Sequence, residues 1–231
     1  MSDFKLNGRL CSAAAFVRQR AVLADIGTDH AYLPIFLLSS GSIDRAFATD
    51  INEGPLRSAE DNIRAAGFAE KVTLMLTDGA AALSGLGITD YTVCGMGGEL
   101  IAEIIDKAPH LRNCGVRLIL QPMTRQAHLR KYLITHGFEI KAEAYSLDAG
   151  KYYVCIMAEF SGTESAEEDF PGEYETAAVG ATVIGEGEYH CYLRAKLNSL
   201  TKAAEGKRAG GEDNSSELRS MEAIEKILGI D

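Results

Sequence analysis

The stretch Ala24-Asp25-Ile26-Gly27-Thr28-Asp29-His30-Ala31-Tyr32-Leu33-Pro34 decides the fold of this chain. An apolar run over residues 21–24 comes directly before the loop and predicts a buried strand, and the apolar segment after the loop predicts a helix. The acidic loop therefore lies at a strand-to-helix turn, where nucleotide-binding α/β folds hold their ligand.

The composition of this loop separates two classes of cofactor. Dinucleotide folds use G-x-G-x-x-G so that backbone amides can approach a pyrophosphate. Here Gly27 is kept, but Asp29 and Ala31 stand where the spaced glycines would continue, and a carboxylate repels a pyrophosphate. S-adenosyl-L-methionine carries a sulfonium and an ammonium group and no phosphate, so the loop favours this cofactor over NAD. Asp29 alternatively caps the following helix, and one residue can do both.

The overall composition predicts a cytoplasmic protein with no metal and no membrane segment. Residues 1–5 show no leader pattern, and no run approaches the roughly 18 apolar residues of a membrane span. The five cysteines lack C-x-x-C spacing, which argues against a disulfide framework and against a zinc site. The oligomeric state stays open at this level.

The net charge of −10 is unevenly distributed. Residues 1–160 hold 16 Lys and Arg against 18 Asp and Glu, whereas residues 161–231 hold 7 against 15. Residues 107–138 contain no acid and six cations, which are Lys107, Arg112, Arg117, Arg125, Arg130 and Lys131. This stretch is either a phosphate-binding surface or an ordinary solvated one.

Strands and helices alternate through the first two thirds of the chain. Five strands are predicted over residues 21–28, 45–51, 71–77, 91–94 and 116–121, with helical patterns between them. Gly54-Pro55 opens the clearest helix, and Gly67 ends it. Such repeats form a parallel, doubly wound sheet.

Two further strands, residues 138–145 and 152–160, are separated by too few residues for a crossover helix. We expect them to form an antiparallel hairpin at the C-terminal side of the sheet. A mostly parallel sheet with a C-terminal antiparallel hairpin is typical of the class I (Rossmann-like) methyltransferases. The fold class is therefore α/β.

The remainder of the chain divides into two segments. Residues 161–188 are acidic and rich in glycine, which predicts a linker or loosely ordered segment. Residues 189–231 show helical spacing on both sides of a glycine-rich turn, with Asn214 and Glu217 as a possible capping box, and predict a helical (coiled-coil-like) hairpin. Residues 1–160 form the predicted methyltransferase domain.

Ligands of open parallel sheets lie at the carboxyl ends of the strands, and here all five predicted strand ends carry polar residues or glycines. Asp50 suits the ribose hydroxyls, and Asp78-Gly79 suits the adenine amino group, although both are also common in turns. The residues expected to bind the cofactor are Asp25, Gly27, Thr28, Asp29, His30, Asp50, Asp78, Gly79, Gly95 and Met96. The glycines around Met96 would let a flat base approach the methyl group.

These motifs together resemble the TrmK family of bacterial tRNA methyltransferases. The resemblance rests on Arg9-Leu10, the acidic loop of residues 24–34, Asn52-Glu53-Gly54-Pro55, Asp78-Gly79, Gly95-Met96-Gly97-Gly98 and Leu118-Ile119-Leu120-Gln121-Pro122. It implies methyl transfer from S-adenosyl-L-methionine to N1 of adenine 22 in tRNA, and a catalytic domain followed by a helical tail. The residues expected to contact the substrate are Arg9, His30, Tyr32, Gly97, Gly98, Gln121 and Pro122.

Adenine N1 is a neutral nucleophile, so proximity and alignment supply much of the catalysis. Methylation leaves the base cationic, and Asp29 is the candidate catalytic residue because its carboxylate would stabilise that charge. The alternatives are a methyltransferase of another RNA or of a small molecule, and a non-catalytic RNA-binding module. A nicotinamide-dependent oxidoreductase is disfavoured by the missing glycine pattern.

Overall fold

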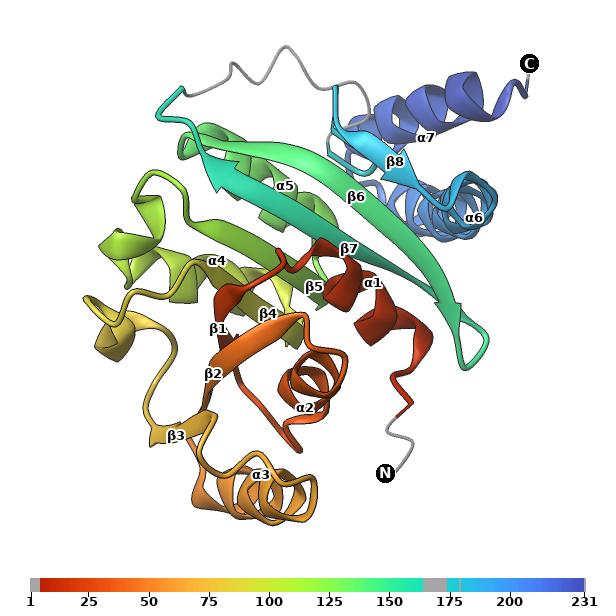
Figure 1. Ribbon diagram of the computed structural model, residues 1–231. Helices are drawn as coiled ribbons and strands as arrows, with labels where there is room; N and C mark the ends of the chain where they lie inside the picture. The colour runs from red at the N-terminus through yellow and green to blue at the C-terminus, as the bar shows by residue number, and fades with distance from the viewer. Residues whose placement is uncertain (1–4, 164–173, 179, 231) are drawn as a thin grey trace.

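The computed structural model describes residues 5–163, 174–178 and 180–230, and its centre is a mixed β-sheet with helices packed on both faces (Figure 1). Within the described residues the sheet has eight strands in the order β3-β2-β1-β4-β5-β7-β6-β8. The strands are β1 Ala21–Ile26, β2 Ile43–Asp50, β3 Val72–Leu76, β4 Asp90–Gly97, β5 Arg117–Thr124, β6 Phe138–Asp148, β7 Lys151–Phe160 and β8 Thr182–Ile184.

The predicted sheet is confirmed, including the hairpin. Strands β1 to β5 are parallel to one another, with β1 between β2 and β4. Strands β6 and β7 are antiparallel to each other, and β7 pairs antiparallel with β5. Because β1 to β5 are parallel, their carboxyl ends lie along one edge of the sheet, where a ligand is expected.

The predicted linker contains a strand that the sequence pattern did not reveal. Thr182–Ile184 pairs in parallel with residues 142–144 of β6 and forms the sheet edge as β8. The loose order expected for the whole of residues 161–188 is therefore wrong for this strand, while residues 164–173 lie outside the described part of the chain.

Helices cover the two faces of the sheet around separate apolar clusters. Residues of α1, α2 and α3 contribute to one cluster, and residues of α4, α5, α6 and α7 contribute to the other. The helices are α1 Gly8–Phe16, α2 Tyr32–Ser39, α3 Glu53–Ala65, α4 Gly98–Asp106, α5 Gln126–Thr135, α6 Glu186–Gly210 and α7 Ser215–Leu228, with short 3-10 turns at η1 Ala81–Leu83 and η2 Pro109–Arg112. None of the described helices is long and apolar enough to cross a membrane.

The C-terminal helical hairpin forms as predicted, but its expected capping box does not. Helix α6 ends at a left-handed Gly211, and α7 starts after Asn214. The Asn214 side chain donates to the Ala204 carbonyl of α6 at 3.2 Å, and Glu217 pairs with Lys207 at 2.7 Å. Both side chains therefore join the two helices to each other instead of capping α7.

A buried ion pair joins the C-terminal segment to the sheet. Arg130 of α5 and Glu143 of β6 are fully buried, and the guanidinium donates to the carboxylate at 3.0 and 2.7 Å. Arg130 also donates to the Tyr174 carbonyl at 2.9 Å, and the Ala178 amide donates to Glu143 at 3.3 Å. The helical tail is thus continuous with the core, and Arg130 is not available to phosphate.

Most of the predicted basic stretch is likewise engaged with carboxylates. Arg112 pairs with Asp106 at 3.3 Å, Arg117 with Glu159 at 2.8 Å, and Arg125 with Glu99 at 3.4 Å. Of the two interpretations left open for residues 107–138, these ion pairs favour an ordinary surface over a row of free cations, because acids from outside the stretch lie beside its arginines.

Candidate functional site

A cavity of about 190 Å³ opens at the carboxyl ends of β1 and β4. The start of α1, the β1–α2 loop and strands β1 and β4 contribute to its lining. Its lining residues are Asn7, Arg9, Leu10, Asp25, Gly27, Thr28, Asp29, His30, Ala31, Tyr32, Leu33 and Cys94. The structure thus brings together six of the predicted site residues from the acidic loop, and adds the predicted Arg9 from the first helix.

Asp25 is the buried carboxylate of the cavity. It lies at the end of β1, is 7% exposed, and accepts a hydrogen bond from Thr92 Oγ1 at 2.7 Å. Burial raises the pKa of Asp25 above its usual value of 3.8, and the hydrogen bond from Thr92 partly opposes this shift. A buried carboxylate at this position favours a positively charged partner, which would hold it ionised.

Position 27 requires glycine for two reasons, its backbone conformation and the close approach of Met96. Its φ of +72° is in the left-handed region, and a Cβ built on it would lie 2.0 Å from Met96 Cε. The Met96 side chain of β4 therefore packs directly over the β1–α2 loop. The next residue, Thr28, is buried and its amide donates to the Thr49 carbonyl at 2.8 Å, which ties the loop to the end of β2.

Asp29, His30 and Tyr32 form the exposed mouth of the cavity. The Asp29 carboxylate lies 3.2 Å from His30 Nε2, with 75% of the Asp29 side chain exposed. The His30 and Tyr32 rings stack with centroids 5.1 Å apart and planes inclined by 25°. The alternative role of Asp29 as a helix cap is not observed, because α2 starts after a left-handed Ala31 with no side-chain cap. A carboxylate and an aromatic surface thus face the entrance together.

Gln121 does not face the crevice as a free amide. Its side chain is fully buried, and its Oε1 accepts hydrogen bonds from Arg9 Nη1 at 3.0 Å and from the Gly95 amide at 3.2 Å. This corrects the expectation that Gln121 contacts the substrate. Gln121 instead holds Arg9 and the end of β4 at Gly95 in place.

The glycines at the end of β4 and the start of α4 differ in environment. Gly95 is exposed with φ +84°, whereas Gly98 is buried, and a Cβ built on Gly98 would lie 2.4 Å from the Arg125 carbonyl. Gly98 is therefore needed for the close approach of two turns, which is a structural reason distinct from the expected substrate contact. Pro122 is also buried, in β5 opposite Met96.

The acids of the neighbouring strand ends lie along the same edge but outside this cavity lining. Asp50 ends β2, and its Oδ1 accepts from the Asn52 amide at 2.8 Å. Asp78 follows β3, and its carboxylate lies 3.9 Å from Lys107 Nζ. Gly79 has φ +64° and would bring a Cβ to 3.4 Å from Ile104. Because β2 and β3 are parallel neighbours of β1, these residues extend the site along the edge of the sheet.

Three lining residues outside the acidic loop were missed by reasoning from the sequence: Asn7, Leu10 and Cys94. Asn7 caps α1 by accepting from the Leu10 amide at 3.1 Å, so the signal was an Asn directly before a helical pattern. Burial and the nearby Asp25 carboxylate raise the pKa of Cys94, against an opposing effect of Arg9, so this thiol stays protonated at neutral pH. Cys94 is therefore part of the wall and not a nucleophile.

Comparison with known proteins agrees with the geometry of this edge. Residues 6–156 match a family described as a methyltransferase domain. A Bacillus subtilis protein named tRNA (adenine(22)-N(1))-methyltransferase is 32% identical over 166 residues, which are 72% of this chain and 70% of that relative.

Solved structures extend the likeness to nearly the whole chain. A Streptococcus pneumoniae protein assigned to the tRNA methyltransferases of this class, in complex with S-adenosyl-L-methionine, aligns with a TM-score of 0.77 and 33% identity, covering 95% of this chain and 98% of that one. M. capricolum TrmK in complex with S-adenosyl-homocysteine aligns with a TM-score of 0.75 and 25% identity, covering 97% and 98%.

Proposed function

Because the chain belongs to the TrmK family of tRNA (adenine(22)-N1)-methyltransferases, we propose that it transfers a methyl group from S-adenosyl-L-methionine to N1 of adenine 22 in tRNA. One structural observation supports this function independently of the family relationship. The cavity at the carboxyl end of β1 combines buried and exposed carboxylates with one guanidinium, and its loop lacks the spaced glycines of a pyrophosphate site.

The charges of the cavity fit the charges of the methyl donor. S-adenosyl-L-methionine supplies its methyl group as a sulfonium substituent, so transfer to adenine N1 breaks an S–C bond, forms an N–C bond and leaves the base positively charged. The buried Asp25 carboxylate suits the ammonium group of the donor, and Arg9 suits an anionic group. Gly27 and Thr28 provide the turn between them.

The nucleoside part of the donor is assigned to the adjoining strand ends. Asp50 would accept hydrogen bonds from ribose hydroxyls, since a carboxylate has capacity beyond its one bond from Asn52. Asp78 would accept from the adenine amino group, and the left-handed Gly79 would keep its backbone free of a side chain there. Gly95 and Met96 of β4 are assigned to the same site, because Met96 packs against Gly27 of the β1–α2 loop.

Asp29 is the proposed catalytic residue. Adenine N1 carries a free lone pair at neutral pH, so no strong base has to act before attack, and alignment supplies much of the rate. The Asp29 carboxylate at the cavity mouth would oppose the positive charge that develops on the base. An arriving base would displace water from this exposed carboxylate, which strengthens the interaction.

The His30 and Tyr32 rings are the proposed surface for the target adenine. Adenine N1 is paired in a regular duplex, so the base has to be unpaired or flipped out before transfer. The two stacked rings beside Asp29 would provide an aromatic face for such a base. A tRNA substrate agrees with a cytoplasmic location, which we also propose.

The test compares two tRNA transcripts that differ at one base. The protein is incubated with radiolabelled S-adenosyl-L-methionine and a transcript with adenine at position 22, and the RNA is digested to nucleosides. We expect N1-methyladenosine to carry the label, and we expect none from a transcript with guanine at position 22. Equal labelling of both transcripts would contradict the position, and absence of labelled RNA would contradict the function.

A further inference from the structure

Helix α1 forms one wall of the cavity, whereas most of the other lining residues come from the ends of strands and the loops that follow them. Its first turn provides Arg9 and Leu10 to the lining, and the capping Asn7 lies beside them. Arg9 is the cation of this group. Its place in the cavity therefore depends on where α1 sits on the sheet.

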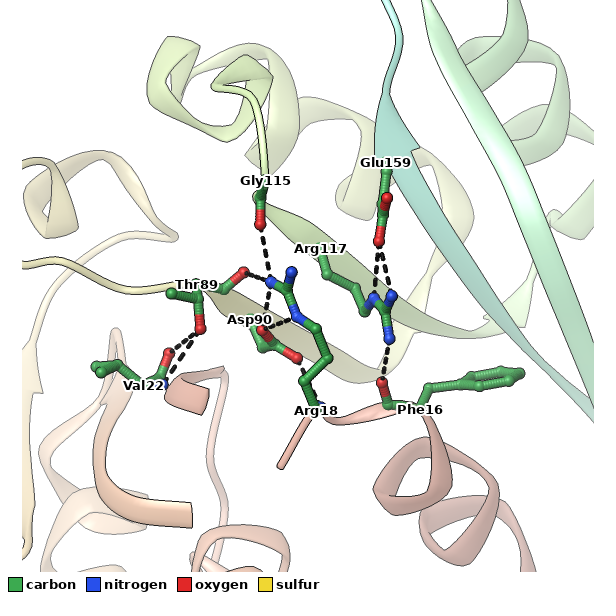
Figure 2. A network of polar contacts seen from close by, with 8 residues as sticks. All are labelled: Phe16, Arg18, Val22, Thr89, Asp90, Gly115, Arg117 and Glu159. Carbon is green, nitrogen blue, oxygen red and sulfur yellow. Dashed lines mark hydrogen bonds and ion pairs between the residues drawn. The ribbon is translucent and has the colours of Figure 1, made fainter. Parts of the chain in front are cut away.

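Two residues beyond the end of α1, a second arginine, Arg18, fixes the chain to the start of β4 (Figure 2). The Arg18 amide donates to Asp90 Oδ2 at 2.9 Å, and its Nε and Nη2 donate to Oδ1 at 2.9 and 2.6 Å. Arg18 Nη2 also reaches the carbonyls of Thr89 at 2.7 Å and Gly115 at 2.8 Å. The Asp90 side chain is fully buried, so this clamp takes the place of solvent around the carboxylate.

Further bonds hold the same helix. Arg117 of β5 donates to the Phe16 carbonyl at 3.2 Å while it pairs with Glu159 of β7 (Figure 2). At the other end of α1, Arg9 Nη1 donates to the buried Gln121 of β5. Strand β5 therefore holds α1 near both of its ends, and β4 holds it through Asp90.

We propose that Arg18 is a positioning residue for methyl transfer, because its clamp on Asp90 fixes α1 and so sets the Arg9 guanidinium in the cavity. Asp90 begins β4 and Cys94 of the cavity lies four residues later, which is about 13 Å along a strand. Arg18 thus acts on the site without touching it. The proposal rests on the proposed function.

Beyond its bond to Gln121, the Arg9 guanidinium suits an anionic ligand. Its two sources in this reaction are the carboxylate of the methyl donor and a phosphate of the tRNA. Displacement of α1 would weaken donor binding in the first case and raise KM for tRNA in the second. Both quantities are measurable on the full-length protein.

The test is a double-mutant cycle on kcat/KM with the variants Arg9→Ala, Arg18→Lys and their combination. Arg18→Lys keeps a positive charge beside Asp90 but loses the planar fork of hydrogen bonds. Loss of a hydrogen bond to a charged group by Arg9→Ala should lower kcat/KM by roughly ten- to a hundredfold. If Arg18 acts through Arg9, adding Arg18→Lys should change the Arg9→Ala value by less than about threefold, although Arg18→Lys alone lowers kcat/KM by more than that.

Arg112→Lys is the matched control, because Arg112 also pairs with an acid, Asp106, and its other contacts are with Tyr132 of α5 and the Phe138 ring of β6. It should leave kcat/KM and the donor dissociation constant near their wild-type values. The combination Arg18→Gln with Asp90→Asn removes both charges of the clamp and serves if Arg18→Lys folds poorly. Fully multiplicative effects of Arg9→Ala and Arg18→Lys, or wild-type kinetics for both clamp variants, would overturn the proposal while the wild-type activity still supports the proposed function.

Discussion

Removing the negative charge of Glu143 should destabilise the protein more than any comparable change at its surface. Glu143 and Arg130 are both fully buried, and Glu143 also accepts from Tyr145 at 2.6 Å and from the Ala178 amide. Glu143→Gln would leave the Arg130 guanidinium buried without its counter-charge. Breaking one side of a buried pair costs about 3–5 kcal/mol. For a chain of this size that corresponds to a fall in Tm of roughly 6–20 °C.

The assay is thermal unfolding followed by circular dichroism, with Glu139→Gln as the matched control. Glu139 lies on the same strand and pairs with Lys141, but 54% of its side chain is exposed. Exposed pairs contribute about 0–1 kcal/mol, so the control should shift Tm by only a few degrees. The two variants make the same chemical change at buried and exposed sites of one strand.

A second variant tests the cause. Arg130→Met combined with Glu143→Gln removes both charges, and it should recover more than half of the lost Tm because no unpaired charge remains in the core. The reasoning is refuted if Glu143→Gln and Glu139→Gln lower Tm equally, or if the double variant is less stable than Glu143→Gln alone.

Three further predictions concern the candidate site. Asp29→Asn should lower turnover at saturating S-adenosyl-L-methionine by roughly tenfold or more, since it removes an electrostatic interaction formed in the transition state; unchanged turnover in single-turnover assays would exclude Asp29 from catalysis. Gly27→Ala should weaken donor binding in calorimetry far more than the control Gly41→Ala. Both glycines have a left-handed φ near +70°, but only at Gly27 would an added Cβ collide with Met96. Equal effects would show that backbone conformation alone matters. Burial raises the pKa of Asp25, so the folded state binds its proton more tightly than the unfolded state, and Asp25 should make the free energy of unfolding fall as pH rises above about 4. Asp25→Asn should remove that part of the pH dependence in denaturant titrations, and a pH profile identical to that of the wild type would contradict it.

The parts of the fold that could be predicted from the sequence are those set by local patterns. The alternation of apolar strands and helices indicated the parallel sheet, and the short connection after residue 145 indicated the antiparallel hairpin. Helix α3 follows its own start and stop signals, with Pro55 in its first turn and a left-handed Gly67 after its end. In each case neighbours in the sequence determine the structure.

The parts that could not be predicted depend on partners distant in the sequence. Gln121 looked available to a substrate, but Arg9 and Gly95 use its amide oxygen, and the first of these lies 112 residues away. The sequence placed Arg130 in a basic stretch, but in the structure it is enclosed by Glu143 and the carbonyl of Tyr174. Strand β8 has only three residues and lies between glycines, so it carries no usable periodicity.

The buried Arg130–Glu143 pair also has a consequence for synthesis of the chain on the ribosome. Arg130 is made 44 residues before Tyr174, whose carbonyl accepts one of its hydrogen bonds. At roughly 5–20 residues per second this interval lasts several seconds. During it, Arg130 and Glu143 lack the segment around Tyr174 that encloses them in the folded protein. The nascent sheet therefore remains incomplete until the residues leading into α6 have been released. A chain that stops after β7 would carry every proposed catalytic residue and still lack the segment that encloses its core.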